Sequence, residues 1–72
     1  MNKFTMYVVF DAGQIIPEEV SFGFEVDAPL DKVSQGVYEQ ASTFGIYDDT
    51  VPGETRFIPN HRIYTVGIEE VA

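Results

Sequence analysis

The chain has 72 residues, which limits it to one small domain, because typical domains contain about 100–150 residues. It contains twelve acidic and four basic residues, giving a formal net charge of −8, and it has no cysteine. A hydrophobic content of 44% is too high for a disordered chain, and the lack of cysteine excludes disulfides and thiol chemistry. Residues 1–72 are therefore expected to form a single acidic globular domain.

The first ten residues superficially have the character of a signal peptide, because Lys3 is followed by an apolar stretch. That stretch stops at Asp11, and no small-residue cleavage site follows it. No run in the chain approaches the roughly 18–20 apolar residues of a membrane span. We therefore expect a cytoplasmic protein that has no membrane partner.

Two segments near the N-terminus alternate between opposite faces, and this period of two predicts β-strands. Residues 3–10 and 20–27 each place four apolar side chains on one face, namely Phe4, Met6, Val8 and Phe10 in the first and Val20, Phe22, Phe24 and Val26 in the second. Turn-forming residues lie between the two segments, so an antiparallel hairpin is the natural pairing.

After residue 27 the apolar spacing changes to three and four, which predicts one α-helix. Asp27 is expected to cap the start of this helix and Gly45 to end it. Its apolar face comprises Leu30, Val33, Val37, Ala41 and Phe44. Gly36 inside the helix costs about 1 kcal/mol relative to alanine, which a closely packed neighbour would explain.

The last third of the chain contains two shorter predicted strands. Residues 47–53 have the composition of a loop, residues 55–58 of a short strand, residues 59–62 of a tight connection and residues 63–68 of the final strand. The predicted fold class is therefore α+β: a small antiparallel sheet of three to four strands with one helix packed on one face, in the order β-β-α-β-β.

Residues suited to catalysis are few. His61 is the single histidine and lies in a predicted turn, and no nucleophile motif surrounds the serine and threonine residues. Asp48, Asp49 and Glu54 bring three carboxylates into one loop, but their spacing does not match a calcium-binding loop. We therefore expect no catalytic residue, no metal and no cofactor, and a protein that is not an enzyme.

The acidic residues are concentrated in the middle of the chain. Residues 11–54 contain ten acids and one base, a charge of −9, whereas the remaining residues together carry +1. Such a region repels phosphate backbones and attracts basic surfaces, so direct nucleic-acid binding is not expected. Ordinary solubility is the alternative explanation of the charge. The candidate partner-binding surface comprises Asp27, Asp31, Glu39, Asp48, Asp49 and Glu54.

One helix covers only part of a sheet, so some apolar residues should remain uncovered. The candidate interface patch comprises Tyr7, Val9, Ile15 and Ile16, unless the loop after the helix folds over it. A homodimer through the open sheet face or a sheet edge would also bury this patch.

Two functions follow from these features. The first is a non-enzymatic acidic interaction module, in its sharpest form an inhibitor whose carboxylates imitate phosphates and occupy the basic surface of a nucleic-acid-handling protein. The alternative is an oligomeric small-ligand-binding protein with a pocket between subunits, lined by Tyr7, Tyr47 and Tyr64 with Arg56 or Arg62.

Overall fold

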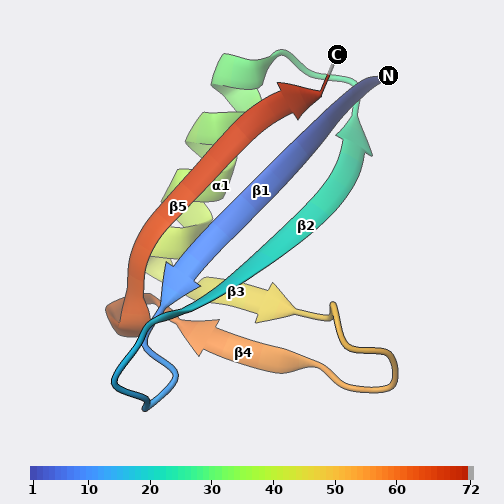
Figure 1. The fold of residues 1–72 in the computed structure, drawn as a ribbon. Coiled ribbons are helices and arrows are strands. Elements are labelled where there is room, and N and C mark those ends of the chain that lie inside the picture. Colours follow the sequence, from blue (N-terminus) through green and yellow to red (C-terminus); the bar gives the residue numbers. More distant parts are fainter. Residues whose placement is uncertain (72) are drawn as a thin grey trace.

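The computed structural model describes residues 1–71. It contains three long strands, one helix and two short strands (Figure 1). The elements in chain order are β1 (Asn2–Phe10), β2 (Glu18–Val26), α1 (Leu30–Thr43), β3 (Gly45–Asp48), β4 (Arg56–Pro59), a 3₁₀ turn (Asn60–Arg62) and β5 (Ile63–Val71). The predicted α+β class and the predicted order of strands and helix are confirmed, with the short strand β3 as an addition.

The three long strands form one antiparallel sheet in the order β2-β1-β5, so β1 is central. The predicted hairpin is confirmed, because β1 and β2 pair along their full lengths, with Met6 opposite Phe22. On the other side of β1, Tyr7 is opposite Gly67. The β1–β5 register shifts between Val9 and Phe10, and β5 carries one extra residue there. Both β2 and β5 end the sheet with an unpaired backbone edge.

The segment after the helix departs from the prediction of a loop. Residues 45–48 form β3, which pairs with β4 as a separate two-stranded ribbon, with Ile46 opposite Ile58. Gly45 makes this pairing available, because its φ of +128° turns the chain out of the helix. A β-carbon on Gly45 would overlap the carbonyl oxygen of Ile58, so only glycine allows the two backbones to approach this closely.

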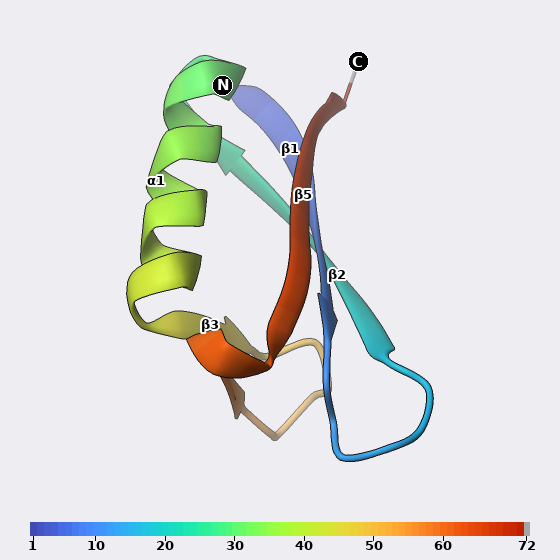
Figure 2. The ribbon, with the colours of Figure 1, turned by 90° about the vertical axis from the view of Figure 1, so that its left-hand side faces the viewer.

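The buried core lies between the two sheets and the helix. Val8, Phe10, Ala41, Ile46 and Ile58 form one cluster of buried side chains, contributed by β1, α1, β3 and β4. The view in Figure 2 shows α1 along one side of the three-stranded sheet, while no element of residues 1–71 lies along the opposite side. The sheet therefore has one partly covered face and one uncovered face.

The helix is less deeply buried than its apolar spacing predicts. Ala41 is its one buried side chain, whereas Leu30 and Phe44 at its two ends are exposed. The predicted N-cap is also wrong, because Pro29 occupies that position and no side chain caps the helix. The segment between β2 and α1 is instead fixed by the Asn2 side-chain amide, which donates a hydrogen bond to the Ala28 carbonyl over 2.9 Å.

No helix within residues 1–71 is long and apolar enough to cross a membrane.

Candidate functional site

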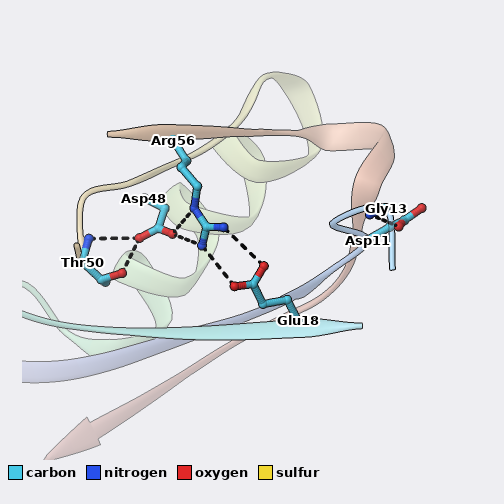
Figure 3. Close-up of polar contacts among 6 residues, drawn as sticks. All are labelled: Asp11, Gly13, Glu18, Asp48, Thr50 and Arg56. Carbon is cyan, nitrogen blue, oxygen red and sulfur yellow. Dashed lines mark hydrogen bonds and ion pairs between the residues drawn. The ribbon is translucent and has the colours of Figure 1, made fainter. Parts of the chain in front are cut away.

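A cluster of three charged side chains joins the ribbon to the three-stranded sheet (Figure 3). Arg56 on β4 donates from Nε and Nη2 to Oδ2 of Asp48, its cross-strand neighbour on β3, over 3.0 and 2.6 Å. The same guanidinium donates from Nη1 and Nη2 to Glu18, the first residue of β2, over 3.3 and 3.4 Å. Arg56 thus connects two sheets that share no backbone pairing.

The second oxygen of Asp48 is also occupied. The backbone N–H and the hydroxyl of Thr50 donate to Asp48 Oδ1 over 3.0 and 2.6 Å (Figure 3). Burial raises the pKa of Asp48, but the hydrogen bonds from Thr50 and Arg56 lower it by more, so the carboxyl pKa lies below its ordinary value. Hydrogen bonds to Asp48 and Glu18 raise the pKa of Arg56, and the guanidinium stays charged.

These contacts correct one member of the predicted partner-binding surface. Asp48 is only 2% exposed, and both of its oxygens accept hydrogen bonds from within the chain. It therefore stabilises the ribbon and is not accessible to a partner. The sequence pattern placed Asp48 in a loop, where its cross-strand relation to Arg56 was not apparent.

The other five predicted carboxylates are exposed, but they do not form one cluster. Asp27 and Asp31 flank the start of α1, and Glu39 lies further along that helix. Asp49 and Glu54 lie in the β3–β4 connection, at the opposite end of the molecule from the start of α1 (Figure 1). Within residues 1–71, no group of three or more histidine or acidic side chains is arranged to hold a metal ion.

The four residues of the candidate interface patch occupy two different places. Ile15 and Ile16 are exposed in the β1–β2 connection, so the loop after the helix does not cover them. Tyr7 and Val9 lie on the uncovered face of the three-stranded sheet, opposite in direction to the buried Val8. The Tyr7 ring lies across Gly67, its partner on β5.

The three tyrosines proposed for a ligand pocket lie apart from one another. Tyr64 borders a groove of about 400 Å³ between α1 and β5, together with Tyr38 and His61. Tyr47 packs against Phe57 of the ribbon in a tilted arrangement, with ring centroids 5.0 Å apart. Arg56 and Arg62 do line a common groove of about 300 Å³ with Phe10 and Phe57.

No protein family, curated protein or solved structure matches the chain. What the protein does is therefore inferred from its own surfaces.

Proposed function

We propose that the protein is a non-enzymatic, cytoplasmic interaction module that binds a basic surface of another protein. The observation that supports this most is the exposure of its carboxylates. Asp27, Asp31, Glu39, Asp49 and Glu54 are all exposed, and the ion pairs within residues 1–71 are those that Arg56 makes with Glu18 and Asp48. Most of the net charge of −8 is therefore left to act on the surroundings.

Exposed like charges of this kind favour encounter with a basic partner. Carboxylates at both ends of a molecule 36 Å long produce a field that extends about 8–10 Å into solution at physiological salt. This field speeds association with a cationic surface and repels nucleic acid. In its sharpest form, the module is an inhibitor whose carboxylates take the place of phosphates on a nucleic-acid-handling protein.

The test is affinity capture from a lysate of the source or host at about 50 mM and about 500 mM salt, read by mass spectrometry. We expect a basic protein that is retained at low salt, released at high salt and captured more weakly by the double variant Asp27→Lys, Asp31→Lys, whose net charge is −4 in place of −8. That protein, once purified, should release a bound fluorescent DNA duplex when the acidic module is added. Capture that does not change with salt, or that the charge reversal does not weaken, would contradict the proposal.

The alternative function is an oligomeric small-ligand binder, and the groove shared by Arg56 and Arg62 favours it. Two guanidinium groups beside Phe10 and Phe57 would suit a ligand that combines an anionic group with an apolar body. Thermal-shift screening of such anions discriminates between the two functions. Stabilisation that disappears in Arg62→Gln would favour the ligand binder, since Arg62 makes no side-chain ion pair with residues 1–71.

A further inference from the structure

The uncovered face of the three-stranded sheet has an ordered arrangement of side chains. Its residues follow from the register of the strands: across β2, β1 and β5, the row at Tyr7 is Ser21, Tyr7 and Gly67, and the next row is Gly23, Thr5 and Glu69. The residues around Tyr7 are mostly small, and the Tyr7 ring occupies the space above Gly67. Such a face can approach a partner closely.

A hollow of about 280 Å³ lies at one end of the same face. It is lined by Lys3, Thr5, Gly23, Glu25 and Val71, all of which belong to this face, and by the adjoining parts of Phe4 and Phe24. The space above Gly23 is open, since a β-carbon built at that position would meet no atom within 4 Å. The hollow can therefore accept a side chain from outside the molecule.

Carboxylates border this face on both edge strands. Glu19 and Glu25 lie on β2 and Glu69 lies on β5, and all three are exposed and form no ion pair with residues 1–71. Lys3 is the one basic residue among the positions that the register places here. The face thus combines an apolar and small-residue centre with a net acidic border, which complements a surface that is apolar in its middle and basic at its margins.

The size of the face argues against a second copy of the chain as its occupant. Three nine-residue strands present about 400 Å² on one side, half of the roughly 800 Å² that each partner of a stable interface usually buries. Self-association would also bring two chains of charge −8 together with their carboxylate borders facing each other. With a basic partner, attraction between opposite charges adds to the binding free energy that this small area provides.

We propose that this uncovered sheet face docks a basic amphipathic helix of a partner protein, with one long basic side chain entering the hollow over Gly23 beside the carboxylate of Glu25, and with Glu19 and Glu69 at the borders of the face. The proposal rests on the proposed function and names the surface that performs it. A helix is the occupant that completes a second layer, because sheet faces in small domains are typically covered by helices.

The test uses the whole chain, labelled with ¹⁵N, and a synthetic amphipathic helix of about 14 residues with leucine on one side and lysine on the other. We expect amide shifts at Thr5, Tyr7, Gly23 and Glu69, and none along α1. Gly23→Val fills the hollow without changing charge, and it should weaken binding about tenfold. Gly36→Ala is the matched control on the exposed side of the helix, and it should bind as the wild type does.

Two charge reversals separate this surface from general attraction. Glu19→Lys with Glu69→Lys alters the sheet face, and Asp31→Lys with Glu39→Lys alters the helix, while both bring the net charge from −8 to −4. The first pair should weaken binding at least about tenfold more than the second. Equal weakening, or unchanged binding by Gly23→Val, would overturn the docking face and leave the proposed function standing. A wild-type chain that does not bind the lysine peptide at low salt would overturn both.

Discussion

The ring of Tyr7 covers Gly67 on the neighbouring strand, and a methyl group at position 67 would occupy the space of the ring. Gly67 is itself buried, although it lies on the uncovered face of the sheet. The pair therefore supplies local cover by one aromatic side chain where no helix covers the sheet.

This contact predicts that Gly67→Ala destabilises the protein, because the Tyr7 ring must leave its position. We expect the free energy of unfolding to fall by about 1–3 kcal/mol, measured by urea denaturation. Gly23→Ala on β2 is the control, since its new β-carbon meets nothing within 4 Å, and it should leave stability unchanged or slightly raised. If the cost of Gly67→Ala persists in a Tyr7→Ser background, the ring is not its cause.

The second prediction concerns two glycines with positive φ, Gly45 at the start of β3 and Gly53 in the β3–β4 connection. Gly45→Ala combines backbone strain at φ +128° with an overlap against the Ile58 carbonyl, and it should cost more than about 3 kcal/mol. Gly53→Ala, at φ +81° in open space, should cost only the strain of about 1–2 kcal/mol. Similar losses in the two variants, compared by thermal and urea unfolding, would show that the close approach at Gly45 contributes nothing.

Asp48 makes stability depend on pH. Its pKa in the folded protein lies below the ordinary value of 3.8, so its contribution is fully present above that value and is lost as the pH falls through the lower, folded value. Unfolding free energies measured between neutral pH and strongly acidic pH should decline in this window, and the decline should be shallower in Asp48→Asn. At neutral pH, Asp48→Asn should cost about 1–3 kcal/mol, because a charged acceptor of four hydrogen bonds is lost.

The exposed neighbour Asp49 supplies the control for that measurement. Asp49→Asn removes the same charge one residue away and should change stability by less than about 0.5 kcal/mol. A pH dependence that is identical in Asp48→Asn and the wild type would assign the acid sensitivity to other carboxylates.

The last prediction concerns the effect of Gly36, inside α1, on stability. Its added β-carbon would meet nothing within 4 Å, so the closely packed neighbour suggested by its place in the helix is absent. Gly36→Ala should therefore stabilise the protein by about 1 kcal/mol, seen as a higher midpoint of urea unfolding with an unchanged slope. A loss of stability would contradict the open space at this position, because it would mean that the added β-carbon meets a neighbour in the folded protein.

Local periodicity was sufficient to predict the long elements. The alternation of residues 3–10 and 20–27 and the helical spacing after residue 27 each repeat over several turns or pleats, so neighbouring residues decide the structure. The ribbon was not predictable in this way. Four residues from Gly45 to Asp48 carry too little pattern, and they become a strand because Ile46 and Ile58 meet in the core.

Asp48 shows that the candidate site, like the ribbon, could not be predicted fully from the local sequence. An aspartate beside a second aspartate in a polar stretch has the pattern of a solvated loop, and its burial depends on Arg56 eight residues later and on Glu18 in another sheet. The exposure of Asp27, Asp31, Glu39, Asp49 and Glu54 was predictable, because the pattern places them in turns or on the polar face of the helix. Their separation into two ends of the molecule required the fold.

The unpaired backbones of β2 and β5 have a consequence for handling the protein. Each edge strand is nine residues long, and every second residue presents open backbone hydrogen-bonding groups, which are a template for growth into fibrils. Exposed glutamates lie along both edges, Glu19 and Glu25 on β2 and Glu69 and Glu70 on β5, and they repel the same edges of a second copy. The same residues that attract a basic partner thus act as gatekeepers against self-assembly.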